Sequence, residues 1–289
     1  MSRPPVGVLG GSGLYRMAGL EGAREERITT PFGDPSDAYV FGTLAGKEVV
    51  FLARHGRGHL LMPGEINFRA NVYGFKTLGV ERLISVSAVG SMKDHLSPLD
   101  VVLPDQFIDR THGRKSTFFG DGIVAHVSFA DPICADLRGV LSRSAEAAGV
   151  RRHDGGIYVC MEGPQFSTRA ESHAYRTLGV DVIGMTNVQE AKLAREAEIC
   201  YATLAMVTDY DCWKEDEDPV TVDEVVKRLN DNATSAEAIL THAVAHLPEE
   251  RRCACASALA QAILTDRNRI PAAAKKRLKA ITGRYLGDA

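Results

Sequence analysis

Short apolar runs alternate along the chain with longer segments in which apolar residues recur with helical spacing. The short runs are rich in β-branched residues and predict strands; they comprise residues 6–9, 48–53, 83–88, 100–103, 156–160, 180–184 and 201–207. The longer segments predict helices at about residues 65–78, 133–148, 168–178, 187–197 and 222–245. This alternation predicts an α/β fold with a parallel or mixed sheet.

Clusters of polar residues stand at the ends of the predicted strands, where each strand joins a loop. In α/β sheets, ligands collect at such strand ends. The clusters contain Ser12, Arg54, His55, Ser87, Glu162, Thr186 and Asp209. Their recurrence predicts one binding site that is assembled from several strand ends.

Size and charge narrow the class of protein. The chain has 289 residues, of which 45% are hydrophobic, and this is enough for one large core. Its net charge of -3 indicates neither a nucleic-acid partner nor a membrane partner. No run approaches about 20 apolar residues and no signal-peptide pattern is present, so we expect a cytoplasmic protein. We interpret residues 248–289 as a helical extension of the domain formed by residues 1–247.

The segment Gly10-Gly-Ser-Gly13 follows the first predicted strand. Glycines let backbone N–H groups approach an anion, and Ser12 adds a hydroxyl donor. A dinucleotide fingerprint would need a further glycine at position 16, which is arginine, and no Gly-Lys-Ser/Thr occurs. The segment therefore disfavours a dehydrogenase and a P-loop, and it stays open between an anion site and a simple turn.

The segment Arg54-His-Gly-Arg-Gly-His59 ends the second predicted strand. A guanidinium can offer phosphate two parallel donors. A solvated basic loop is the alternative, but the neighbouring strand-end donors favour phosphate. His55 and His59 are four apart, yet the glycines between them disfavour a helix, so we expect no shared metal site there.

Two further strand ends carry candidate ligand contacts. Thr168 and Glu171 have the spacing of a helix capping box. Phe166, just before them, either stacks on a flat heterocycle or fills the core. Thr186 either donates to an anion at a helix N-terminus or caps that helix. Met185 offers a soft apolar surface to a sugar face.

The apolar run 201–207 leads into Thr208-Asp-Tyr-Asp211. If the strand continues, Asp209 and Asp211 share a face. The following helix has its own capping box at Thr221 and Glu224, so neither aspartate is needed as a cap. Burial and mutual repulsion raise a carboxyl pKa, and a proton held in this way can be donated to a departing nitrogen base.

The helix after this pair carries an apolar stripe formed by Val222, Val225, Val226 and Leu229. Such a stripe is core by default. Its first turn could also line the apolar end of a pocket.

The chain has six cysteines, none with the paired Cys-x-x-Cys spacing of many zinc sites; they are Cys134, Cys160, Cys200, Cys212, Cys253 and Cys255. A chain of this size needs no disulfide framework. Cys253-Ala-Cys255 stays open between a redox pair and two ordinary helix cysteines, which is the commoner case.

These segments, in this order, resemble the 5′-methylthioadenosine phosphorylases of the purine nucleoside phosphorylase family. The resemblance runs from about residue 6 to about residue 245. The matching segments are Gly10–Gly13, Ala53–Arg57, Ser87–Ser91, Asp105–Arg110, Glu162–Ser167, Met185–Thr186 and Thr208–Trp213.

The resemblance implies a single α/β domain with a central mixed sheet flanked by helices, and a homotrimer. It implies phosphorolysis without a metal or an organic cofactor. Inorganic phosphate, the co-substrate, would attack the anomeric carbon of methylthioadenosine. Adenine would leave, and 5-methylthioribose 1-phosphate would form.

The resemblance also implies roles for individual residues. Phosphate would contact Ser12, Arg54, His55, Ser87, the Ala88 backbone and Thr186. The nucleoside would contact Phe166, Ser167, Met185, Val222, Val225 and Val226, with His126 offered by a neighbouring subunit. Asp209 and Asp211 would be the catalytic pair that holds the 6-amino group and N7 of adenine.

The residue type at position 209 bears on the substrate. An aspartate that donates to N7 can accept from a 6-amino group, whereas the related 6-oxopurine phosphorylases carry asparagine there. Asn187 and Gln189 depart from the threonine and proline of many relatives, and serines replace threonines at positions 12 and 87. The alternatives are a phosphorylase for 6-oxopurine nucleosides or methylthioinosine, and a non-catalytic nucleotide-binding protein, which would not explain the carboxyl pair.

Overall fold

The computed structural model describes residues 4–14, 17, 19–214 and 222–287, with side chains for all of these except 222–226. The described strands form one eleven-stranded sheet. They are β1 (Val6–Gly10), β2 (Glu21–Glu26), β3 (Tyr39–Leu44), β4 (Lys47–Ala53), β5 (Arg82–Ser91), β6 (Val101–Leu103), β7 (Gln106–Arg110), β8 (Arg152–Asp154), β9 (Ile157–Met161), β10 (Val182–Gly184) and β11 (Cys200–Tyr210).

Helices cover the sheet on both faces, and each helix and strand predicted from the periodicity is present. The helical segments are α1 (Phe68–Thr77), α2 (Ala135–Ala147), α3 (Arg169–Thr177), α4 (Asn187–Glu196), α5 (Val222–His246), α6 (Ala272–Arg277) and α7 (Lys279–Leu286), with 3₁₀ turns η1 (Pro63–Glu65), η2 (Ala254–Ser257) and η3 (Arg267–Arg269). The predicted capping box of α3 is confirmed, since Thr168 Oγ1 accepts from the Glu171 N–H at 3.2 Å.

The centre of the sheet is parallel. Strands β4, β1, β5 and β11 are neighbours in that order and run in the same direction. The β2–β3–β4 meander and the pairings of β10 with β5 and of β6 with β11 are antiparallel. The predicted mixed α/β sheet is therefore confirmed. Because the four central strands are parallel, their carboxyl ends meet at one edge of the sheet.

The sequence patterns missed the strands β2, β3, β7 and β8. Strand β2 is exposed along its whole length and carries Glu21, Arg24, Glu25 and Glu26. Charged residues on an edge strand block pairing with other chains, and they also remove the alternation that predicts a strand. Strand β3 returns to β4 through Ala45 and Gly46, both with positive φ, so the pair forms a tight hairpin.

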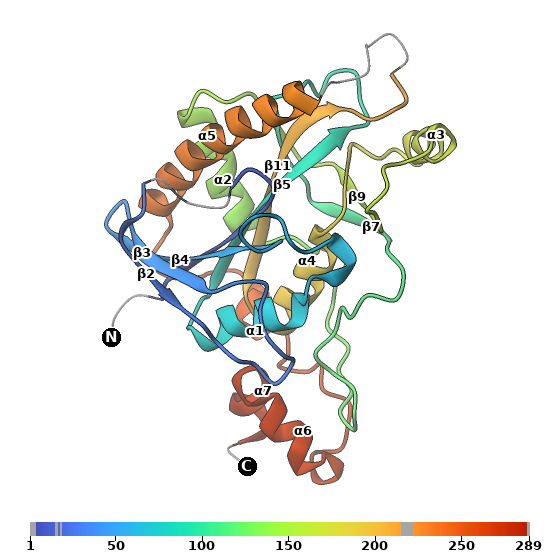
Figure 1. The fold of residues 1–289 in the computed structure, drawn as a ribbon. Helices are drawn as coiled ribbons and strands as arrows, with labels where there is room; N and C mark the ends of the chain where they lie inside the picture. The colour runs from blue at the N-terminus through green and yellow to red at the C-terminus, as the bar shows by residue number, and fades with distance from the viewer. Residues whose placement is uncertain (1–3, 15–16, 18, 215–221, 288–289) are drawn as a thin grey trace.

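Helices α2 and α5 pack on each other and on β11, and α4 packs against α1, β5 and β11. After α5 the chain runs to α6 and α7, and α7 packs on α1. In Figure 1 these last two helices lie at the end of the molecule away from the carboxyl ends of β5 and β11. No helix in the described ranges is both long and apolar enough to cross a membrane.

Candidate active site

The strand register sets the position of each candidate side chain along the strand direction of the sheet. Gly10 of β1 lies beside Ala53 of β4, so the glycine loop and Arg54 leave the sheet together. Leu9 lies beside Ser85 of β5, and Ser87 lies beside Ala205 of β11. The sequence segments chosen as candidate anion contacts therefore meet at one edge, as expected for parallel strands.

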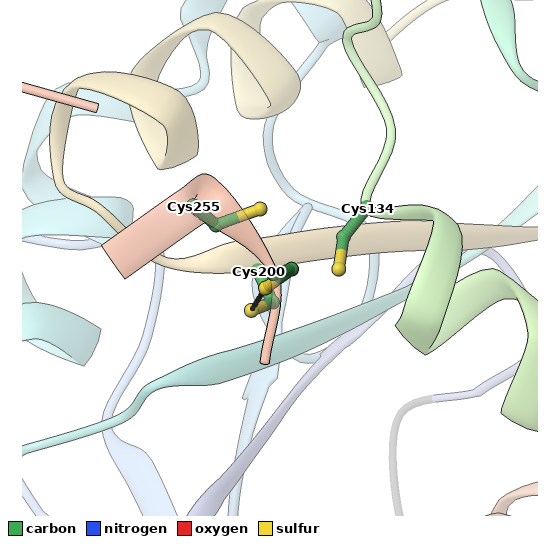
Figure 2. A group of neighbouring side chains, drawn as sticks. Cys134, Cys200 and Cys255 are labelled. Atoms are coloured by element: carbon green, nitrogen blue, oxygen red, sulfur yellow. Dashed lines mark hydrogen bonds between the residues drawn. The ribbon is translucent and has the colours of Figure 1, made fainter. Parts of the chain in front are cut away.

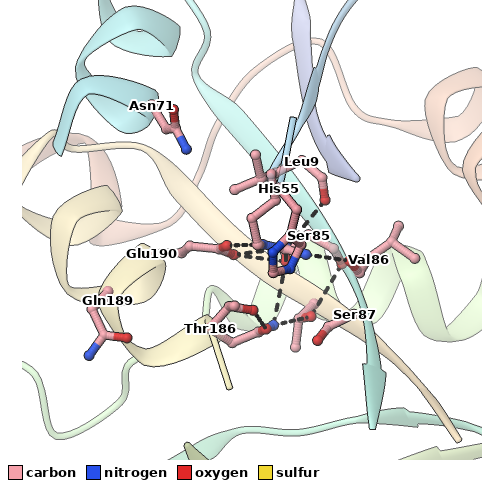
Figure 3. Close-up of polar contacts among 12 residues, drawn as sticks. Leu9, His55, Asn71, Ser85, Val86, Ser87, Thr186, Gln189 and Glu190 are labelled. Carbon is pink, nitrogen blue, oxygen red and sulfur yellow. Dashed lines mark hydrogen bonds and ion pairs between the residues drawn. The ribbon is translucent and has the colours of Figure 1, made fainter. Parts of the chain in front are cut away.

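Arg54 lies at the bottom of this edge and is only 1% exposed. Its Nε and Nη2 atoms bind the carboxylate of Glu190, which is fully buried in the first turn of α4. Nη2 also donates to Ser85 Oγ at 2.6 Å, and Nη1 donates to the Val86 carbonyl at 3.0 Å. Tyr201 and Ser85 donate to the same carboxylate. Figure 3 shows Glu190, Ser85 and Val86 close together at this point.

This arrangement corrects one sequence interpretation. The two parallel donors of Arg54 already bind the Glu190 carboxylate, so they are not available to bind phosphate as a fork. Burial alone would lower the pKa of Arg54, but Glu190 raises it, and the guanidinium stays charged. At most one N–H, on Nη1, remains for a ligand. Arg54 thus acts mainly as a buried positive charge under the site.

The glycine loop lies directly over that charge. A Cβ at Gly11 would come within 2.7 Å of both Arg54 Nη1 and the Val86 carbonyl oxygen. Only glycine lets the loop lie this close. The loop therefore passes close to Arg54 at Gly11, immediately before the half-buried Ser12. The interpretation of this segment as a simple turn does not explain that close approach.

His55 follows Arg54 and is neutral. Burial and the Arg54 charge lower its pKa to about 4. Nδ1 lies 2.8 Å from the Leu61 carbonyl, which can only accept, so Nδ1 carries the hydrogen and Nε2 is an acceptor. The ring stacks on His59 with centroids 4.3 Å apart. The ring thus has a fixed tautomer.

A chain of hydroxyl and amide groups links the remaining anion candidates. Thr186 stands at the N-cap position of α4, but its side chain does not cap the helix and donates instead to Asn187 Oδ1 at 3.1 Å. Tyr158 donates to the same oxygen at 3.2 Å and lies 3.3 Å from Ser87 Oγ. Asn187 in turn donates to Thr203 at 2.6 Å. Asn187 is therefore the hub of this part of the site.

The carboxyl pair occupies the end of β11. The register slips between Val207 and Asp209, so Thr208 is the extra residue of a β-bulge. A Cβ at Gly90 of β5 would lie 3.6 Å from both Asp209 Oδ2 and Asp211 Cβ. The predicted shared face of the two aspartates is thus confirmed. Bulges redirect side chains at functional sites.

The two carboxylates differ in their surroundings. Thr208 Oγ1 donates to Asp209 Oδ1. Asp211 Oδ2 is buried and has no hydrogen-bond partner within the described part of the chain. A buried carboxylate oxygen without a donor is costly, so it marks a position where a ligand N–H would be stabilising.

Residues 162–168 form the wall of the site beside Asp211. Arg114 holds this wall, because its Nε donates to Glu162 Oε1 at 3.1 Å and its Nη1 donates to the Met185 carbonyl. A Cβ at Gly163 would lie 2.5 Å from Met185 Sδ, so loop and Met185 are in direct contact. Cys212, next to Asp211, donates to the Ser167 carbonyl. The loop therefore joins Met185 to the end of β11.

The remaining candidate residues are either exposed or lie outside the described side chains. Phe166 is 84% exposed, so the interpretation of this residue as core is wrong. His126 is also exposed. The predicted lining residues Val222, Val225 and Val226, and the capping box at Thr221 and Glu224, lie outside the described side chains.

Sequence reasoning assigned no role to Glu190 or Arg114. Glu190 stands in the first turn of a helix that follows a strand end, and it lies on the buried face of that helix. A buried acid at this position requires a buried cation as its partner. That pattern could have indicated it. Arg114 follows none of the strand ends predicted from the sequence, and only the folded loop brings it to Glu162 and Met185. No sequence pattern indicates that contact.

Comparison with known proteins agrees with this site. A family model for the phosphorylase superfamily matches residues 5–245. An S-methyl-5′-thioadenosine phosphorylase of Koribacter versatilis is 62% identical and covers 98% of this chain and 97% of its own length. One of Geobacter sulfurreducens is 57% identical, with coverages of 97% and 99%.

Solved structures agree as well. A methylthioadenosine phosphorylase from an antarctic soil metagenomic library superposes with a TM-score of 0.92 at 50% identity, covering 97% of this chain and 99% of that one. A methylthioadenosine phosphorylase from Schistosoma mansoni, in complex with adenine, gives 0.84 at 37% identity, with coverages of 89% and 96%.

The chain therefore belongs to the phosphorylase superfamily. Within it, the chain falls in the S-methyl-5′-thioadenosine phosphorylase family, a group of pentosyltransferases of the purine nucleoside phosphorylase type. The resemblance inferred from the sequence segments is confirmed.

The buried ion pair generates a first prediction. Glu190→Gln leaves Arg54 charged and uncompensated, so we expect a loss of about 3–5 kcal/mol in the free energy of unfolding. Denaturant unfolding measures it. Glu21→Gln, on the exposed edge strand β2, is the control and should change stability by less than about 0.5 kcal/mol. Equal stability of the two variants would contradict the role given to the pair.

His55 generates a second prediction. The folded protein keeps His55 neutral, whereas the unfolded chain binds a proton below pH 6.5, so acidification from pH 6.5 to 4 favours unfolding. We expect a loss of about 3 kcal/mol across this window. Glu196, whose pKa burial raises to about 7, acts in the opposite direction. The difference in unfolding free energy between the parent chain and His55→Gln isolates the His55 contribution, and parallel pH profiles would refute it.

Proposed function

We propose that this protein cleaves the N-glycosidic bond of S-methyl-5′-thioadenosine with inorganic phosphate and releases adenine and 5-methylthioribose 1-phosphate. The observation that carries the proposal is the pairing of two half-sites on adjacent strands. Donors gather around Ser87, and the carboxyl pair lies against Gly90. These β5 positions are three residues apart, about 10 Å, which suits a phosphate and a purine on either side of a ribose.

The phosphate half-site combines a buried charge with neutral donors. Ser12, the glycine-loop backbone, Ser87, the Ala88 backbone and Thr186 surround the anion. The positive charge of Arg54 and the N-terminus of α4 attract it from below and from the side. His55 Nε2 accepts a hydrogen from a protonated phosphate oxygen, because its Nδ1–H is held by Leu61.

The purine half-site follows from the end of β11. Asp209 in its neutral form donates to N7 of the departing adenine. The buried Asp211 Oδ2 accepts from the 6-amino group, which supplies the donor that this oxygen lacks among the described residues. Met185 lies against the ribose, and Phe166 and Ser167 lie beside the base. Val222, Val225 and Val226 contact the 5′-methylthio group.

The catalytic steps are electrostatic. Departure of adenine leaves positive charge on the ribose ring, and the phosphate anion stabilises that charge before it forms the new C–O bond. The proton from Asp209 neutralises the purine as the C–N bond breaks. Each of these interactions is expected to lower the barrier by about 2–4 kcal/mol.

The wider setting is also part of the proposal. The reaction requires no resident cofactor or catalytic metal, and phosphate is a co-substrate. The enzyme is a cytoplasmic homotrimer with no nucleic-acid or membrane partner. The exposed His126 reaches the pocket of a neighbouring subunit.

A substrate panel tests the proposal. We expect adenine release from methylthioadenosine only when phosphate is present, because phosphate is the nucleophile. Chromatography of the products measures it, with adenosine, inosine and methylthioinosine in parallel. Faster cleavage of the 6-oxo nucleosides would favour the alternative phosphorylase, and binding without turnover would favour a nucleotide-binding protein.

Asp209→Asn tests the proton donor. We expect activity on methylthioadenosine to fall by roughly 10²–10³-fold, because the amide has no acidic proton for N7. Some activity on inosine should appear, since an amide N–H can donate to a 6-oxo group. Asp231→Asn, exposed on α5, is the matched control. An unchanged ratio of the two activities in Asp209→Asn would count against the assignment.

A further inference from the structure

Four cysteines from distant parts of the chain meet at the start of β11. Their Sγ atoms all lie within 4.8 Å of one another. Cys134 precedes α2, Cys200 opens β11, and Cys253 and Cys255 belong to the segment after α5. Figure 2 shows the side chains of Cys134, Cys200 and Cys255 near one another. Cys253 precedes η2 and Cys255 lies in this 3₁₀ turn, so the two are not residues of an α-helix.

The sulfur geometry suits a metal ion better than a bond between sulfurs. Cys200 Sγ and Cys253 Sγ are 3.3 Å apart. A disulfide needs about 2.05 Å, whereas the edge of a tetrahedron with Zn–S bonds of 2.3 Å is about 3.8 Å. All four are free thiols. A closed set of four sulfur ligands is typical of a structural zinc site.

The position of Cys134 favours negative charge on its sulfur. Cys134 lies at the N-terminus of α2, where the helix dipole stabilises an anion. A thiolate ligand at this position would therefore be stabilised by the helix N-terminus.

A second, independent observation is a cation beside the cluster. Arg82 Nη2 is buried and, over the described ranges, has no hydrogen-bond partner. Arg82 borders the same surface depression as Cys134, Cys200 and Cys253, together with Arg251 and Arg252. Four thiolates around a divalent cation carry a net charge of -2, and this charge would compensate the half-buried Arg82 guanidinium. The depression also gives an ion access from solvent.

The cluster is remote from the reaction. Cys200 and Asp209 stand near opposite ends of β11, nine residues or about 30 Å apart. Two of the cysteines come from the sheet and α2, and two from the segment that leads to α6 and α7. Arg251 joins the same regions through the carbonyl of Glu198 and the carboxylate of Glu81.

We propose that Cys134, Cys200, Cys253 and Cys255 bind one zinc ion, which fastens the segment after α5 to the base of the sheet. On binding, each of the four thiols loses its proton to solvent and four Zn–S bonds form, with no change of oxidation state. This site is separate from the metal-free phosphorolysis proposed above and does not depend on it. Zinc would act on stability, not on the reaction.

Metal analysis of the full-length protein tests the proposal. The protein is purified with a thiol reductant and without chelator, and its zinc content is measured by mass spectrometry. We expect about one zinc per chain. Replacement by cobalt should give the intense visible bands and the sulfur-to-metal charge transfer of tetrahedral thiolate ligation. Two results would overturn the proposal. The first is fully reduced protein that takes up neither zinc nor cobalt. The second is protein that contains two disulfides within the cluster and still binds no metal after these are reduced.

Variants and chelation locate the site. Cys253→Ser and Cys255→Ser should lower zinc affinity by roughly 10–100-fold or more, whereas Cys212→Ser, exposed and outside the cluster, should keep its zinc. Removal of zinc from the parent protein with a chelator should lower Tm and open the segment after residue 247 to protease, and added zinc should restore both. If the serine variants do not fold, this chelation experiment still decides. Unchanged Tm and protease resistance after complete zinc removal would refute the stabilising role.

Discussion

The ion pair between Arg54 and Glu190 is the interaction on which the site depends. A charge taken out of water must be compensated, and the Glu190 carboxylate compensates Arg54, from which it accepts two hydrogen bonds. Ser85 and Tyr201 donate further hydrogen bonds to the same carboxylate. The pair ties the end of β4 to the start of α4. It fixes the positive charge over which the glycine loop closes, and Gly11 permits that contact.

The bulge at Thr208 makes the second half of the site. A regular β11 would leave Asp209 and Asp211 with a different register against β5, whereas the bulge sets Asp209 beside Gly90. Gly90 lies against both carboxyl side chains, and Arg114 holds the wall beside Asp211 through Glu162 and Met185. The geometry thus places the acid pair at Gly90, three residues along β5 from Ser87, and the proposed function rests on this spacing.

The sequence predicted most of this architecture, because buried parallel strands and amphipathic helices leave strong periodic patterns. It failed at β2, whose charges protect an exposed edge, and in the assignment of the Arg54 fork. The Arg54–Glu190 contact spans 136 positions of the chain and no local pattern encodes it. The cysteine cluster was missed for the same reason, since Cys134 and Cys200 meet Cys253 and Cys255 only after folding.

A crystal structure with phosphate and a non-reacting analogue of methylthioadenosine tests the account most directly. It should show the purine edge against Asp209 and Asp211 and the phosphate over Ser12 and Ser87. The Arg54 guanidinium should still be paired with Glu190, with no more than its Nη1 atom on the anion. A purine bound away from the end of β11, or an Arg54 that leaves Glu190 to grip phosphate with both donors, would contradict the account.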